Sequence, residues 1–130
     1  MMEKYVIIMG NGTKVSTTNV NLEALTTIFN KNNTLAAVIG SKSMVKHTVV
    51  AVAKIETVSE SEENNIIINV GDTSFYTTVE SPRKTLESLT DDINNNKKLF
   101  VLVNGEILIN RNGYQYAEIL EDKTETQANA

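Results

Sequence analysis

Few residues of this chain are of the types that perform acid–base, nucleophilic or metal chemistry, and they are scattered along it. His47 is the single histidine and there is no cysteine, which excludes a disulfide, a thiolate nucleophile and a cysteine metal site. A lone histidine could act as a general base, but it has no evident partner, and the matching position in the second half is Arg111. We interpret His47 as a polar residue at a strand end. The sequence therefore predicts no catalytic residue, no metal site and no cofactor.

Two other patterns could be taken for chemical sites. Gly10-Asn11-Gly12 follows an apolar strand, as a phosphate-binding loop would, but such a loop leads into a helix and here a second strand is expected. We interpret it as a hairpin turn. Asp91 and Asp92 are neighbouring acids on a predicted helix, where adjacent residues point about 100° apart. They are expected on a solvated face, and neither pattern supports an enzyme.

Aromatic and basic residues supply the candidate binding surface. Five of the seven aromatic residues lie in the second half of the chain, on predicted strands. One interpretation is that this half has a bulkier core. The other is that its tyrosines line a binding face beside basic strand ends, since tyrosine offers apolar area together with a hydroxyl and can stack on nucleic-acid bases. The surface would comprise Tyr76, Tyr114, Tyr116, Arg111, Lys42, Lys46 and His47.

The composition limits the remaining classes of function. The chain has 130 residues, 41% of them hydrophobic, which suits one compact domain or two small lobes that share a core. Its net charge of −4 argues against broad, non-specific DNA binding, although a local basic patch is compatible with it. The N-terminal apolar run is too short for a signal peptide, and no run approaches the roughly 20 apolar residues of a membrane helix. The sequence predicts a cytoplasmic protein that does not enter membranes.

The elements that must position these residues occur twice along the chain. A shift of 64 residues pairs Asn30 with Asn94 and needs no gap through the segments that follow. Upstream, a shift of 61 residues pairs Gly10 with Gly71, so a three-residue insertion is expected near residues 80–82. Strand, turn and helix signals recur in the same order, which indicates two copies of one unit.

Each unit is predicted to contain a hairpin, a helix and three further strands. The helices are expected to begin after Asn19 or Asn21 and after Ser81-Pro82, which are typical N-terminal residues. The expected strands are Lys4–Met9, Lys14–Thr18 and residues 35–39, 43–47 and 48–56 in the first unit, and residues 65–70, 74–79, a hairpin within 95–110, and 114–120 in the second.

The predicted fold class is α+β, with two tandem ββαβββ-like repeats. Each antiparallel sheet would be covered by one helix, in a pseudo-two-fold arrangement, although edge-to-edge joining into one longer sheet is an alternative. Exposed edge strands invite self-association, so a homo-oligomer is compatible with the pattern. The expected boundaries are a first repeat at residues 1–56, an acidic linker at 57–65, a second repeat at 66–121 and a disordered tail at 122–130.

The turn Asn104-Gly105 between two apolar runs is the strongest hairpin signal in the chain, because both residues tolerate a positive φ. Residues 100–110 and 113–120 give an apolar strand, this Asn-Gly turn, a strand containing Ile-Asn and a final strand. This sequence pattern resembles that of small phage and prophage proteins of low-GC Gram-positive bacteria. Their roles vary and include regulation and inhibition of host defence, so the resemblance implies the host cytoplasm as compartment but no particular site residue.

The function expected from these observations is non-catalytic binding to a protein partner, which fits a phage- or prophage-type regulator or host-defence inhibitor. The alternative is a nucleic-acid or nucleotide-binding protein that uses the tyrosines of the second repeat and the basic strand ends.

Overall fold

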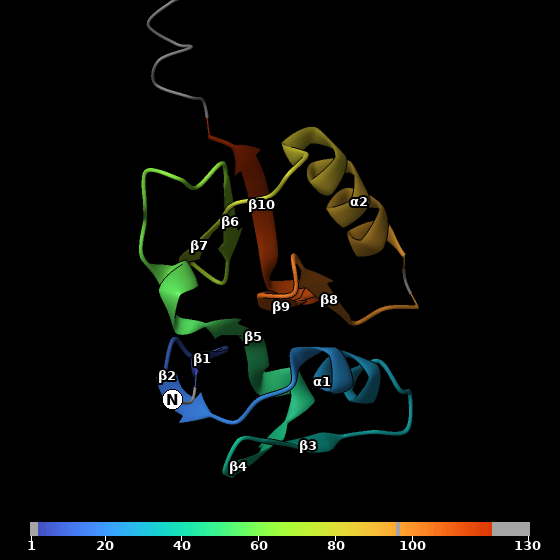
Figure 1. Cartoon of the computed structure of the whole chain (residues 1–130). Helices are drawn as coiled ribbons and strands as arrows, with labels where there is room; N and C mark the ends of the chain where they lie inside the picture. The colour runs from blue at the N-terminus through green and yellow to red at the C-terminus, as the bar shows by residue number, and fades with distance from the viewer. Residues whose placement is uncertain (1–2, 96, 121–130) are drawn as a thin grey trace, which may run out of the picture.

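Residues 3–95 and 97–120 are described by a computed structural model, and they form a mixed α+β fold with antiparallel sheets (Figure 1). The tail expected at residues 122–130 lies outside the described residues. Helix α1 is Leu22–Phe29 and helix α2 is Pro82–Asn94. The ten strands of the described part are β1 (Lys4–Met9), β2 (Lys14–Thr18), β3 (Ala36–Ile39), β4 (Lys42–Val45), β5 (Val49–Lys54), β6 (Ile66–Val70), β7 (Thr73–Thr77), β8 (Phe100–Val103), β9 (Ile107–Asn110) and β10 (Tyr114–Ile119). Three short 3-10 turns are η1 (Lys46–Thr48), η2 (Ile55–Val58) and η3 (Arg111–Gly113).

The elements stack in three layers (Figure 1). The central layer is a five-stranded sheet in the order β2-β1-β5-β9-β8. Above it in Figure 1 lie the three-stranded sheet β10-β6-β7 and helix α2, and below it lie helix α1 and the hairpin β3–β4. We call the apolar interior above the central sheet the upper core and the interior below it the lower core.

Alternating side chains of the central sheet supply both cores. Along β1, Val6 and Ile8 face the upper core, whereas Tyr5 and Ile7 face the lower core. This is the two-residue period of a strand, and it explains why the β1 sequence is apolar at consecutive positions. A sheet covered on both faces leaves no polar side for these residues.

The central sheet combines strands from both halves of the chain. Strand β9 pairs with β5, with Ala51 opposite Ile109 and Ala53 opposite Ile107. This pairing corrects the expectation that each repeat forms its own sheet under its own helix, because the hairpin β8–β9 of the second half extends the sheet of the first half. The reason is burial: Ile107, Leu108 and Ile109 are all fully buried, which requires cover on both faces.

The local signals for turns and helix ends act as the sequence predicts. Asn104 and Gly105 both have positive φ, at 53° and 65°. Helix α1 begins after Asn21, whose side-chain oxygen accepts a hydrogen bond from the Ala24 N–H at 3.0 Å. Helix α2 begins after Ser81 with proline in its first turn, although the Ser81 side chain makes no capping hydrogen bond.

Several boundaries differ from the predicted ones, and two of them fall in 3-10 turns. The acidic linker was expected from residue 57, yet Thr57 is buried within turn η2 and its hydroxyl donates to the Lys54 carbonyl at 2.7 Å. The strand expected at residues 43–47 ends at Val45, because η1 turns the chain there from the hairpin into the central sheet. His47 therefore lies in a turn.

Candidate functional site

A pocket of about 390 Å³ opens where connecting segments of both halves meet. From the first half it is lined by the end of α1, the loop that follows it and turn η1. From the second half it is lined by the loop after α2 and by turn η3. The residues that bear on its chemistry are Asn30, Lys46, His47, Lys97, Lys98 and Arg111.

Lys46 is a structural residue of this pocket. It is 6% exposed, and its ammonium group donates hydrogen bonds to the carbonyls of Phe29 at 3.2 Å and Lys31 at 2.9 Å. These carbonyls lie at the C-terminal end of α1 and just beyond it, where unpaired acceptors and the negative end of the helix dipole favour a cation. The charge of Lys46 is therefore directed at the backbone, and the residue is not a free base of the binding surface.

Asn30 joins the end of α1 to the edge of strand β8. Its side-chain amide donates to the Phe100 carbonyl at 2.9 Å, and its side-chain oxygen accepts from the Phe100 N–H at 2.8 Å. The amide thus pairs with both backbone groups of one residue, as a neighbouring strand would. The ring of Phe29 packs on that of Phe100, with centroids 4.6 Å apart. The sequence pattern indicated only that Asn30 ends a helix, so this contact was missed.

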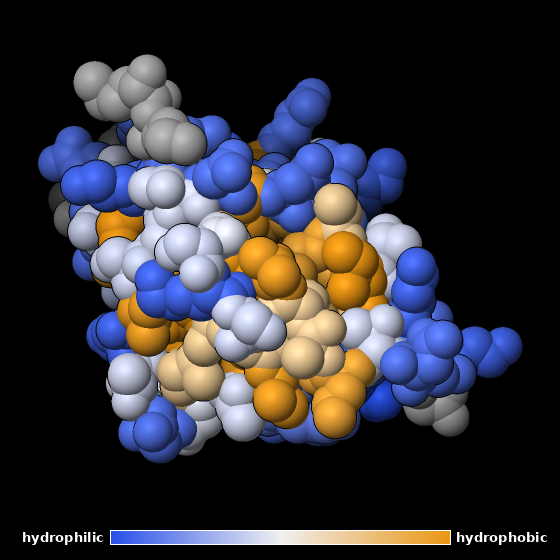
Figure 2. All heavy atoms as spheres, turned by 90° about the horizontal axis from the view of Figure 1, so that it is seen from below, coloured by the Kyte–Doolittle hydropathy of each residue, from blue (hydrophilic) through white to orange (hydrophobic). Residues whose placement is uncertain are grey.

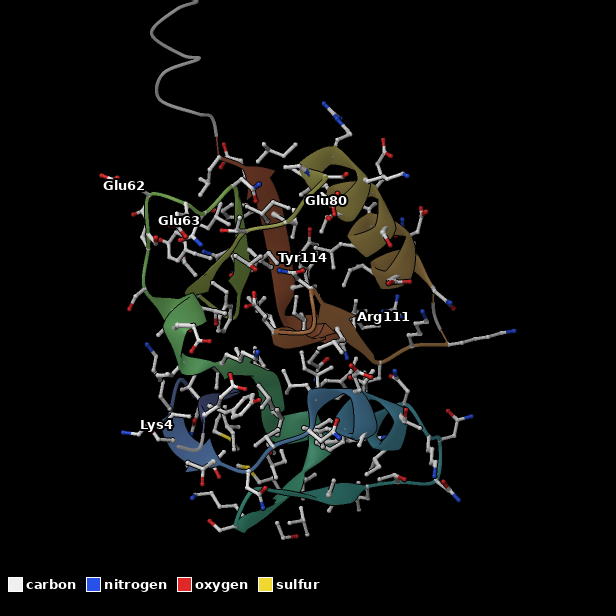
Figure 3. The ribbon with its side chains drawn as sticks, viewed as in Figure 1. Lys4, Glu62, Glu63, Glu80, Arg111 and Tyr114 are labelled. Carbon is white, nitrogen blue, oxygen red and sulfur yellow. The ribbon has the colours of Figure 1, made fainter. Side chains whose placement is uncertain are left out.

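Besides Lys46, the basic residues that line the pocket are His47, Lys97, Lys98 and Arg111. His47 and Lys97 are exposed and Arg111 is half-buried. Lys98 forms an ion pair with Asp92 at 3.1 Å, so its charge is partly compensated. Arg111 lies on the side of the molecule where the loop after α2 returns to β8 (Figure 3). The pocket consequently presents positive charge and side-chain amides, which suits an anionic ligand.

The three tyrosines of the predicted surface do not share one face. Tyr114 packs against the upper core, between β10 and α2 (Figure 3), and burial raises the pKa of its hydroxyl above the ordinary value. Tyr116 is 50% exposed on the opposite face of the three-stranded sheet. Tyr76 faces away from the core that receives Phe75, so it shares the face of Tyr116. Lys42 lies on β4, outside the pocket.

A second candidate site is the outer face of the hairpin β3–β4. Viewed from below, the molecule shows a continuous apolar patch on the face that carries this hairpin (Figure 2). Val38 at 70% and Val45 at 42% are exposed on its strands, and Leu35, just before β3 at the rim of the pocket, is 63% exposed. We call these three residues the hairpin face. Grouped apolar side chains of this kind mark binding surfaces more often than single ones do.

Neither site carries the groups of a metal centre, since no cluster of three or more His, Cys, Asp or Glu residues lies within residues 3–95 and 97–120. In the same part of the chain, no helix is long and apolar enough to cross a membrane. No family model matches the chain, and the comparisons with curated proteins and with solved structures gave no match either.

Proposed function

We propose that this chain is a non-catalytic binding protein that acts through contact with a protein partner, of the phage- or prophage-type class that its sequence resembles and that includes regulators and inhibitors of host defence. The observation that carries this proposal is the hairpin face. Val38 on β3 and Leu35 just before it are more than half exposed, at 70% and 63%, in a two-stranded hairpin that pairs with no other strand of the described residues. Burying such side chains under a partner is favourable by about 25 cal/mol per Å² of apolar surface.

The absence of any cysteine in the sequence allows a direct test of this proposal. A Leu35→Cys variant labelled with a photo-reactive group is expected to give a covalent adduct with its protein partner when irradiated in cell extract. The matched control is Ser16→Cys, labelled in the same way, because Ser16 is exposed on the edge strand β2 away from the hairpin.

Adding Val38→Lys to the Leu35→Cys chain is expected to remove the adduct, because a lysine would place charge in the apolar contact. The measurement is the yield of adduct by mass spectrometry. Equal yields from the hairpin and control positions, or a yield that Val38→Lys leaves unchanged, would contradict the proposed function.

We also propose that the two halves are copies of one unit. The β1·β5 and β6·β10 pairings correspond residue by residue, and each contains a bulge that skips one residue of the second strand. Beside each bulge a glycine N–H donates to a turn carbonyl, Gly10 to Thr48 at 2.9 Å and Gly71 to Gly113 at 2.8 Å. These matched details support duplication more strongly than the shared order of elements does.

The packing supports head-to-tail stacking of the copies in place of the expected pseudo-two-fold arrangement. In the matched registers, Tyr5 and Ile7 of β1 correspond to Ile66 and Ile68 of β6. The first pair faces the lower core and the second pair faces the upper core, so corresponding faces of the two sheets point in the same direction. A two-fold axis would turn one of these faces over.

Anion binding in the pocket is the second candidate function, and the grouping of His47, Lys97 and Arg111 around one opening favours it. Calorimetric titration with a nucleotide and with a single-stranded oligonucleotide is the test. Binding that weakens steeply with salt and is lost in Arg111→Ala, but retained in the control Lys14→Ala, would support it. If neither ligand binds detectably at low salt, anion binding in the pocket is ruled out.

A further inference from the structure

Two strand edges of this fold are left without a partner although their counterparts are paired. Within the described residues, β4 pairs only with β3, and β10 pairs only with β6. The matched registers make β4 the counterpart of β9 and β10 the counterpart of β5, each with a shift of 65 residues. The ungapped shift of 64 expected from the sequence is wrong here, because the β8–β9 turn is one residue longer than the β3–β4 turn. Strands β5 and β9 pair with each other, and this pairing joins the two halves.

We propose that the β4 edge of one copy of this chain pairs with the β10 edge of a second copy, in the antiparallel geometry that β5 and β9 use within the chain. This inference rests on the proposed function, because it assigns the partner that contacts the hairpin. An exposed strand edge is a ready template for such pairing. In Figure 1, β4 and β10 lie at opposite ends of the molecule, so one chain does not supply both edges of the same contact.

The register of the contact follows from the pairing already present. Within the chain, Ala51 lies opposite Ile109 and Ala53 opposite Ile107. Moved by 65 residues, these pairs become Tyr116 opposite Met44 and Glu118 opposite Lys42. The second pair brings opposite charges together across the strands, and the first sets the exposed ring of Tyr116 beside a thioether.

The hairpin face has a counterpart that is buried within the chain. With the matched shift of 64 residues, Val38 corresponds to Leu102, which packs against the lower core, and Ala36 corresponds to Phe100, which is fully buried. The hairpin β8–β9 is covered there by helix α1. The hairpin face of a second copy would be covered in the same way by helix α2, the counterpart of α1.

The end of α2 carries a side-chain amide that can bond the β3 backbone of a second copy. Asn30 holds the backbone of Phe100 through two hydrogen bonds, at 2.8 and 2.9 Å. Its counterpart Asn94 is exposed at the end of α2, and the counterpart of Phe100 is the exposed residue Ala36. Asn94 of one copy would therefore bond the backbone of Ala36 in the next copy, at the free edge of β3.

Such contacts are heterologous, because each copy gives its β4 edge to one neighbour and its β10 edge to another. They build either an open row of copies or a closed ring. Sedimentation of the full chain over a wide concentration range is the test, and wild-type protein is expected to form species larger than one chain.

Charge reversal tests the register. Lys42→Glu and Glu118→Lys each place like charges opposite one another, and each is expected to weaken association about tenfold. The double variant restores an opposite pair and is expected to recover the wild-type association constant. Lys14→Glu on the remote strand β2 is the control and should leave association unchanged.

Wild-type protein that stays monomeric at every concentration would overturn this inference, as would a double variant no stronger than the single ones. The outcome that contradicts the proposed function is different from the outcomes that contradict self-pairing. A monomeric chain whose labelled Leu35→Cys variant still gives a Val38-dependent adduct with a different protein would leave that function standing and overturn the self-pairing alone.

Discussion

Phe100→Ala is expected to lower the free energy of unfolding by about 3–5 kcal/mol, because it removes a fully buried ring and leaves a cavity. The ring packs on Phe29 with a centroid distance of 4.6 Å, and it lies where α1 of the first half meets β8 of the second. The lost free energy of unfolding therefore comes from the contact that holds the two halves together. Urea denaturation followed by circular dichroism measures it.

Leu35→Ala is the matched control for this substitution. Leu35 is also a large apolar residue beside the hairpin of its half, but it is 63% exposed. Its truncation is expected to change the free energy of unfolding by less than about 0.5 kcal/mol. Similar losses for the two variants would contradict the assignment of Phe100 to the shared interior.

Gly40→Ala is expected to destabilise the chain by about 3 kcal/mol, the sum of a strained backbone and an overpacked contact. Gly40 has a φ of 61°, and a Cβ atom added there would lie 1.9 Å from the Thr17 hydroxyl oxygen and 2.6 Å from the Thr18 carbonyl oxygen. The turn of the hairpin β3–β4 thus packs directly on strand β2. Thermal denaturation of the variant measures the cost.

Gly105→Ala separates the two causes. Gly105 has nearly the same backbone conformation, with a φ of 65°, but a Cβ atom there would meet nothing within 4 Å. Only the strained backbone remains, at about 1–2 kcal/mol. If Gly105→Ala destabilises as much as Gly40→Ala, the close approach of the hairpin to β2 is not what restricts Gly40.

Secondary structure was predictable here because local chemistry determines it. Asn21 caps a helix through its own side chain, and Asn104-Gly105 supplies the positive φ values that a tight turn needs. The layering was not predictable in the same way, because pairing of β5 with β9 joins residues far apart in the chain. One signal was present: β9 reads Ile107-Leu108-Ile109, typical of a strand buried on both faces, whereas β4 begins with the polar pair Lys42-Ser43.

The candidate site was predicted only in part. Arg111 and His47 line one pocket, but the sequence matched them wrongly, because turns η1 and η3 pair Lys46 with Arg111 and His47 with Asn112. Lys46 was grouped with them on charge alone, but its ammonium group is used by the backbone of α1. The role of Asn30 depends on Phe100, which lies 70 residues further along the chain, and nothing in the sequence near Asn30 signals it.

The most direct measurement of the central claim is disulfide trapping between copies, since the chain has no cysteine of its own. Two single variants, Ser43→Cys on β4 and Ala117→Cys on β10, are mixed and oxidised gently. The register places these two positions opposite each other, so a covalent dimer joined between residues 43 and 117 is expected in high yield. A mixture of Ser16→Cys and Ala117→Cys should give little. Equal yields from the two mixtures, or no dimer from the first, would contradict pairing of β4 with β10.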